Sequence, residues 1–408
     1  MQARSAWSDS GSFLDTEEMY GRALDLDWGR ALRAHGLAAF ILKHSGVGAD
    51  DEGRSARDGP QSAEGEDLER QEIWEVRAVL WEHHTLIYKT FDAYSSVGSA
   101  DFSHVSNNAY QKFVEDAKLS DKRSKSCNKT SLDQLFLMVN QVERKNIKPK
   151  AENALRGAAP SSPGKAPKLT KEQQEEQALN EADYDTRALN RMEWLQCLVR
   201  IAIMKFIIGG QMTNVAEAVR KLFEEHLEPN LAGGGPSSFD ANDFRQNACY
   251  QEETDAVLVE FMPSIRALFA VAAATDNYDV ANKAASEVLS FQEWMRMMKV
   301  FDLIDQEFTV REASLAFLWS RMRVVDDTSK HSKLRLENLS LEDFYEALIH
   351  VALMKALPTD WEIEEAGMDD AGEFILRMRE TNASEFRKWS LENAARCAQV
   401  ESGPPSPS

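Results

Sequence analysis

The stretch LSFQEWMRMM (residues 289–298) decides the fold, because its pattern occurs four times along the chain. An aliphatic residue is followed by Ser or Asn, then by an aromatic residue five positions after the aliphatic one and an apolar residue nine positions after it. Ser and Asn are favoured helix N-caps, so each copy predicts the start of an amphipathic helix. The other copies are VSNNAYQKFV from Val105, LNRMEWLQCL from Leu189 and LSLEDFYEAL from Leu339.

The aromatic position of each copy is expected to anchor a hydrophobic core. A further helical pattern precedes each copy, and no run of alternating β-branched residues is bounded by turn residues. The sequence therefore predicts an all-α fold with four successive helix–loop–helix units. The four aromatic residues are Tyr110, Trp194, Trp294 and Phe344, and the preceding helical patterns cover residues 72–94, 131–142, 254–275 and 310–325.

The repeated pattern resembles the end of the calcium loop in the EF-hand superfamily. In that family a hydrophobic residue is followed by a Ser or Thr cap, two variable residues, an acidic ligand and an aromatic residue that begins the exiting helix. Glu193, Glu293 and Asp343 occupy the acidic position here, whereas Ala109 departs from it. The resemblance covers roughly residues 70–357. It implies two lobes of paired EF-hand-like units, similar to calmodulin-like proteins, with additional N- and C-terminal helices.

The loops lack the ligands that calcium requires. Calcium takes six to eight oxygen ligands, which an EF-hand loop supplies through the pattern D-x-[DN]-x-[DN]-G-x5-E. None of the four units keeps this pattern, and the residues at the first ligand position are Gly98, Ala182, Asn282 and Ser332. We therefore expect units that do not depend on calcium, in which Glu193 and Glu293 are first-turn acids that favour the helix dipole.

A calcium sensor with atypical loops is the alternative. The third unit offers the best candidate metal site, formed by Asp276, Asp279 and Glu293. Its spacing would need a lengthened, irregular loop. The other acids near the loops are Asp183, Asp185, Asp326 and Asp327.

Breaks in the helical pattern predict the domain organisation. Residues 1–67 are expected to hold an N-terminal helix (13–44) and a disordered linker, because 45–67 is rich in Gly, Ser and acids. Residues 68–210 would form the first lobe, with a disordered insertion at 144–182 that is rich in Pro, Gly and Lys. A connecting helix and a Gly-rich loop would fill 211–239, the second lobe 240–357, and an acidic helical tail with a disordered end 358–408.

Charge limits the partners that this chain can bind. The formal net charge is -20, which argues against nucleic-acid binding and against adsorption to anionic membranes. The most apolar stretch, from Cys197 to Ile208, is too short to span a bilayer, and the N-terminus has no apolar signal core. A cytoplasmic protein, with a possible cytoskeletal association, is therefore expected. Its predicted partner is a protein or a basic amphipathic helix.

Motifs of catalysis and of cofactor binding are absent from the sequence. It has no Walker A loop, no G-x-G-x-x-G after a strand, no G-x-S-x-G and no H-E-x-x-H. Glu346 and His350 share one helix face and are expected to be a surface pair rather than half of a metal site. Cys197 is expected to be a reduced core thiol. We therefore expect a scaffold or adaptor that is not an enzyme and binds no cofactor, with a structural part of a cytoskeletal or ciliary assembly as a further alternative.

Overall fold

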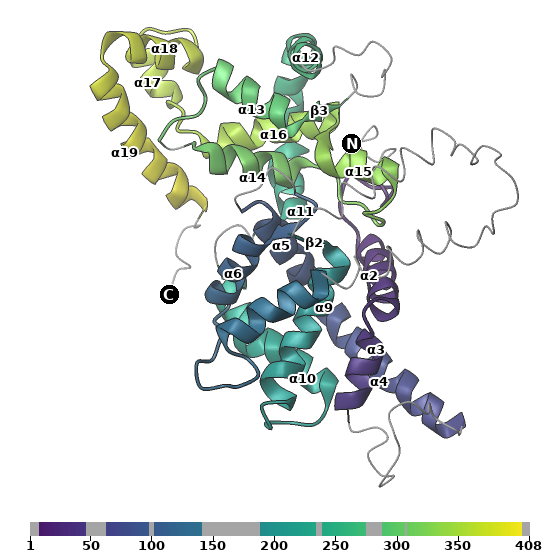
Figure 1. Cartoon of the computed structure of the whole chain (residues 1–408). Coiled ribbons are helices and arrows are strands. Elements are labelled where there is room, and N and C mark those ends of the chain that lie inside the picture. Colours follow the sequence, from purple (N-terminus) through teal and green to yellow (C-terminus); the bar gives the residue numbers. More distant parts are fainter. Residues whose placement is uncertain are drawn as a thin grey trace, which may run out of the picture. The chain divides into compact units, whose positions relative to one another are not determined.

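A computed structural model of the chain describes residues 8–45, 63–97, 102–140, 188–233, 239–274, 288–306 and 308–401, apart from the side chains of 63–66, 330 and 394–401. The predicted all-α class is confirmed, because the structure is predominantly helical (Figure 1). The chain divides into two compact units. Unit 2 comprises Glu17–Phe239 and Val325–Asp327, and unit 1 comprises Met1–Thr16, Asp240–Val324 and Thr328–Ser408.

Unit 2 contains two helix–strand–helix segments and several further helices. The first segment is α5 (His84–Ser95), β1 (Val105–Ser106) and α6 (Asn107–Asp116). The second is a helix at 129–140, β2 (Ala188–Leu189) and α9 (Arg191–Ala202). The further elements are α2 (Glu17–Arg33), α3 (Leu37–His44), α4 (Ala63–Glu82), α10 (Val215–Leu222) and the π-helices η1 (Ile203–Ile207) and η2 (Phe223–Ala232).

Unit 1 repeats this arrangement. Its first segment is α12 (Glu252–Ala273), β3 (Leu289–Ser290) and α13 (Phe291–Val300), and its second is α14 (Val310–Ser320), β4 (Asn338–Leu339) and α16 (Leu341–Met354). The unit also contains α11 (Ala241–Phe244), η3 (Arg245–Cys249), α15 (Lys330–Glu337), α17 (Asp360–Glu365), α18 (Ala371–Thr381) and α19 (Ala383–Glu401).

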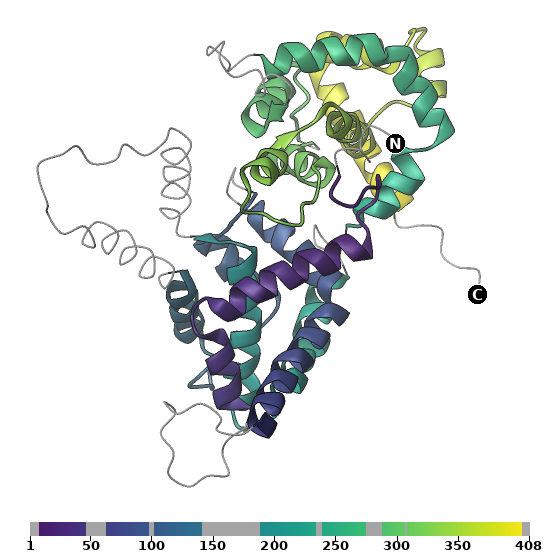
Figure 2. The same ribbon diagram turned by 90° about the vertical axis from the view of Figure 1, so that its right-hand side faces the viewer.

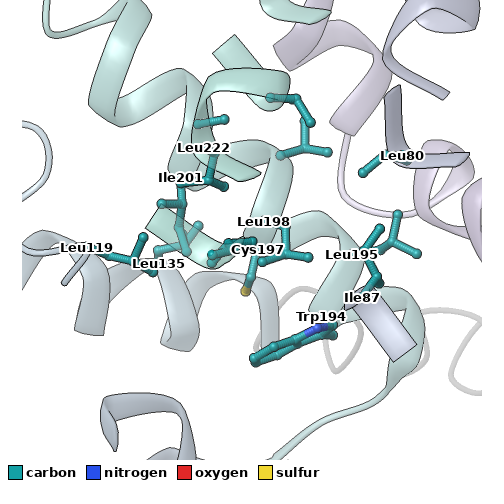
Figure 3. Packing of buried hydrophobic residues seen from close by; sticks show 14 of the residues in the cluster. Leu80, Ile87, Leu119, Leu135, Trp194, Leu195, Cys197, Leu198, Ile201 and Leu222 are labelled. Atoms are coloured by element: carbon teal, nitrogen blue, oxygen red, sulfur yellow. The ribbon is translucent and has the colours of Figure 1, made fainter. Parts of the chain in front are cut away.

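The N-terminal helix (13–44) and the connecting helix (within 211–239) were predicted to lie outside the first lobe. Both belong to the hydrophobic core of unit 2. Leu24 and Trp28 of α2, Ile41 of α3 and Leu222 of α10 are all buried in the same hydrophobic cluster as Trp194. Figure 2 shows α2 as the long purple helix, and Figure 3 shows the centre of the cluster around Cys197 and Leu198. The helix that was predicted to connect two lobes is therefore an integral part of unit 2. The long segment of this unit ends at Phe239.

Other predicted boundaries differ in smaller ways. The predicted helix 72–94 is divided at His83, between α4 and α5, and α4 begins at Ala63, inside the predicted linker. The His83 ring stacks on Phe223 with a centroid distance of 4.3 Å, which fixes this break against the core. Residues 46–62 of the predicted linker, the insertion 144–182 and the C-terminal end 402–408 lie outside the described residues.

A buried ion pair ties three helices of unit 2 together. Arg191, at the start of α9, binds both carboxylate oxygens of Asp27 in α2, at 3.0 and 3.2 Å. The Tyr88 hydroxyl in α5 donates to the same carboxylate at 3.0 Å. Loss of hydration raises the pKa of Asp27 to about 6, although the Arg191 charge opposes this shift. Asp27 is fully buried and Arg191 is 6% exposed, so neither charge can turn to solvent.

Replacing one partner of this pair should strongly destabilise unit 2. Arg191→Met leaves the Asp27 carboxylate buried without its counter-charge, and we expect the free energy of unfolding to fall by about 3–5 kcal/mol. Urea denaturation, followed by far-UV circular dichroism, measures this loss. The matched control is Arg77→Met, which removes a solvent-exposed pair with Asp25 and should cost less than about 1 kcal/mol. Equal losses of unfolding free energy in the two variants would contradict a stabilising role for the buried Asp27–Arg191 pair.

Candidate functional site

The four repeated sequences lie where two short strands meet in each unit. In unit 2, β1 pairs with β2 in antiparallel fashion and Val105 lies opposite Leu189. In unit 1, β3 pairs with β4 and Leu289 lies opposite Leu339. These are the four aliphatic residues that open the repeated pattern. Each unit therefore joins two helix–loop–helix segments at the same position of the repeat.

Each strand continues directly into a capped helix. The side chains of Ser106, Asn190, Ser290 and Ser340 accept a hydrogen bond from the backbone N–H three residues later. The predicted N-caps are thus confirmed in all four repeats, and each such cap contributes about 1 kcal/mol to helix stability.

The acidic residues of the repeat complete three of these caps. Glu193 accepts the backbone N–H of Asn190 at 2.9 Å, and Glu293 accepts that of Ser290 at 2.9 Å. Asp343 accepts the N–H of Ser340 at 3.0 Å. All three acids are buried. Each carboxylate therefore satisfies a helix N-terminus, which is a structural use of the position where the EF-hand pattern has a metal ligand.

The aromatic residue of each helix–strand–helix segment packs against the other segment of the same unit. Tyr110 of α6 packs on Phe136 at a centroid distance of 5.2 Å, and its hydroxyl donates to the Leu132 carbonyl. Trp194 of α9 packs in return against Tyr94 of α5, at 6.3 Å. Each helix that follows a strand therefore contributes its aromatic side chain to the helix that precedes the partner strand.

Unit 1 repeats the same exchange. The Trp294 indole N–H donates to the Ala313 carbonyl of α14 at 2.9 Å. Phe344 of α16 packs on Phe269 of α12, with ring centroids 5.4 Å apart, and also on Trp294 at 6.1 Å. Tyr110, Trp194, Trp294 and Phe344 are each no more than 1% exposed. The rings thus hold the two segments of each unit together.

Three of the four loops fall largely outside the described residues. Gly98 in the first loop, Ala182 in the second, and Asp276 and Asp279 in the third all lie there. The candidate metal site of the third unit is therefore described only at Glu293, whose carboxylate caps α13. Among the described residues, no group of three or more His, Cys, Asp or Glu side chains is placed to hold a metal ion.

The fourth loop, between α14 and β4, does not have the form of a calcium loop. Helix α15 occupies the positions that counting back from Asp343 would assign to ligands, and Leu336 is buried there. The acids upstream are also engaged. Asp326 and Asp327 pair with Arg30 at 2.7 and 3.2 Å, within unit 2. Both carboxylates are therefore used in ion pairs within unit 2.

Glu346 and His350 are buried, so the predicted surface pair is wrong. Glu346 accepts hydrogen bonds from Arg245 at 3.0 Å and from the Tyr250 hydroxyl at 2.9 Å. The His350 ring stacks on Phe244 with a centroid distance of 3.7 Å. Burial and the nearby Arg245 charge together lower the pKa of His350 to about 3, so the ring is neutral near pH 7. Both side chains serve the core of unit 1.

Two pockets of the described part of the chain are lined by charged side chains, and each contains an ion pair. A pocket of about 380 Å³ in unit 1 is lined by Asp302, Arg379, Arg387 and their neighbours, and Arg379 is paired with Asp302 at 3.0 Å. A pocket of about 410 Å³ in unit 2 contains His83, which is paired with Glu228 at 3.0 Å. Cys127, Cys197 and Cys249 are buried free thiols.

Comparisons with protein-family models, with curated proteins and with solved structures found no match to this chain.

Removing a ring of the aromatic exchange should destabilise unit 1 far more than removing an exposed ring. Phe344→Ala leaves a cavity against Phe269 and Trp294, and we expect a loss of about 3–5 kcal/mol in the free energy of unfolding. The control is Trp361→Ala in the same unit, where the side chain is 67% exposed and the change should stay within about 0.5 kcal/mol. Urea denaturation compares them. A small loss for Phe344→Ala would show that the exchange contributes little.

Proposed function

We propose that this chain is a non-catalytic protein-binding scaffold made of two EF-hand-like lobes that keep their shape without calcium. The observation that carries the proposal is the register of the strands, in which Val105 lies opposite Leu189 and Leu289 opposite Leu339. Paired loops joined by a short antiparallel bridge, each followed by a capped helix with a buried aromatic residue, are what an EF-hand origin predicts for these four repeats.

Calcium independence is supported by the use of the acidic residues. Glu193, Glu293 and Asp343 accept backbone hydrogen bonds at helix N-termini, and the fourth loop contains a helix in place of ligands. In a calcium sensor, by contrast, ion binding changes the angle between paired helices and exposes an apolar groove. Here packed rings already hold the helices together, so the lobes have no need of the ion.

A binding role is supported by the charge of the chain. With a net charge of -20, the molecule attracts basic surfaces and repels nucleic acids and anionic lipids. A cytoplasmic location is part of this proposal, because the three described cysteines form no disulfide, which fits a reducing compartment.

Isothermal calorimetry with calcium tests calcium independence, with magnesium as the control ion. We expect no saturable heat up to millimolar calcium, because no complete ligand set is present in the sequence. Glu293→Gln is the matched variant, since it removes the carboxylate that would close a third-loop site with Asp276 and Asp279. Saturable binding tighter than about 10 μM that disappears in Glu293→Gln would contradict the proposal and identify a calcium sensor.

A further inference from the structure

Helix α12 of unit 1 is apolar on two faces, and the described structure covers only one of them. The inner face includes Phe269 and Ala273, which are buried, and Phe269 packs on Phe344. Among the described residues, α12 is the one helix long and apolar enough to cross a membrane by length and composition. Buried helices of soluble proteins can have the same length and composition, so these two features alone do not establish a membrane span. Only 17% of its most apolar window is buried, however, so the helix leaves much apolar surface uncovered.

Three of the four exposed large apolar residues of α12 form a stripe on one side of the helix, and the fourth, Val259, lies on the opposite side. Val257, Phe261 and Val271 are 56%, 52% and 71% exposed. Together with Ser264 and Leu268 they follow one another at steps of four and three residues, which places them on one side of a helix. The stripe extends over about 21 Å of the helix axis, at 1.5 Å per residue. That length fits one partner helix lying along it.

The charges beside the stripe are acidic. Glu253 and Glu260 are exposed, lie on the same side of the helix as the stripe and form no ion pair with the part of the chain that the structure describes. Glu252 and Asp255 add further negative charge in the first turn, whereas Arg266 falls on the other side of the helix. An acid-flanked apolar stripe is complementary to a helix with an apolar face and basic flanks.

We propose that the outer face of α12, defined by Val257, Phe261 and Val271 with Glu253 and Glu260, binds a basic amphipathic helix of a partner protein. The proposal rests on the protein-binding role stated above and gives that role a surface and a class of partner. A second copy of this chain fits less well, because it carries the same net charge of -20. A lipid surface fits less well because these acids oppose anionic headgroups and the inner face is already packed.

A peptide titration tests this surface directly. The probe is a synthetic helix of about 20 residues with a Leu face and Lys flanks, long enough to span the stripe. Its control is the same peptide with Glu in place of Lys. Both are titrated calorimetrically into the full-length protein in a calcium chelator, so the outcome is separate from that of the calcium titration. We expect the basic peptide to bind and the acidic peptide not to bind.

Variants locate the binding on α12. The triple change Val257→Gln, Phe261→Gln and Val271→Gln should weaken the basic peptide at least tenfold, and Glu253→Lys with Glu260→Lys should weaken it while reducing the salt dependence. The matched control is Leu376→Gln on α18, which also removes an exposed apolar side chain (60% exposed) and should not change affinity. Helical content and melting temperature establish that every variant is folded.

Several outcomes would overturn the proposal. Equal binding of the basic peptide by wild type and the triple variant would remove α12 as the site while leaving the protein-binding role intact. If the acidic peptide bound as tightly as the basic peptide, Glu253 and Glu260 would not select a basic partner. A wild-type dimer that the triple variant abolishes, seen by sedimentation, would assign the face to a second copy. Flotation with phosphatidylcholine vesicles that the triple variant abolishes would assign it to lipid.

Discussion

The antiparallel bridge between two loops is the constraint on which each unit depends. Val105 opposite Leu189, and Leu289 opposite Leu339, set the register of the exiting helices. A two-residue bridge is too short to be stable alone. It persists because Tyr110 and Trp194 in one unit, and the corresponding Trp294 and Phe344 in the other, bury their rings against the partner segment. Strand register and ring packing thus support each other.

Buried charges contribute specificity to this apolar framework. Arg191 pairs with Asp27 in unit 2, and Arg245 pairs with Glu346 in unit 1. Each pair must form in one geometry, because a misplaced buried charge loses its partner and cannot recover its hydration. In unit 2 the pair connects α2 to α9, so the N-terminal helix can dock in one position only.

Much of the fold could be predicted from the sequence, because its signals are local. An aliphatic residue followed by Ser or Asn and then by an apolar stripe identified the starts of the exiting helices, and the aromatic position identified the core anchors. The ion pairs could not be predicted in this way. Asp27 and Arg191 are 164 residues apart, and nothing near either residue indicates the other.

The candidate site was predictable in the same uneven manner. The absence of the EF-hand ligand pattern from the loops is visible in the sequence. Helix α15 in the fourth loop is not, since Ser332, Leu334 and Leu336 carry no strong helical periodicity. The burial of Glu346 and His350 depends on Arg245 and Phe244, about 100 residues earlier in the chain. Helix α12 has two apolar faces in the sequence. Only the structure shows which of them packs in the core of unit 1 and which stays exposed.

The central claim is that ring packing and strand pairing, rather than a metal ion, hold the paired segments together. Residue-resolved hydrogen exchange tests it most directly, by comparing the backbone amides of α6, α9, α13 and α16 in a chelator with those in millimolar calcium. We expect equal protection in both conditions, with the two segments of each unit opening together. Protection that develops only in calcium, or that is lost in one segment while its partner stays protected, would contradict the claim.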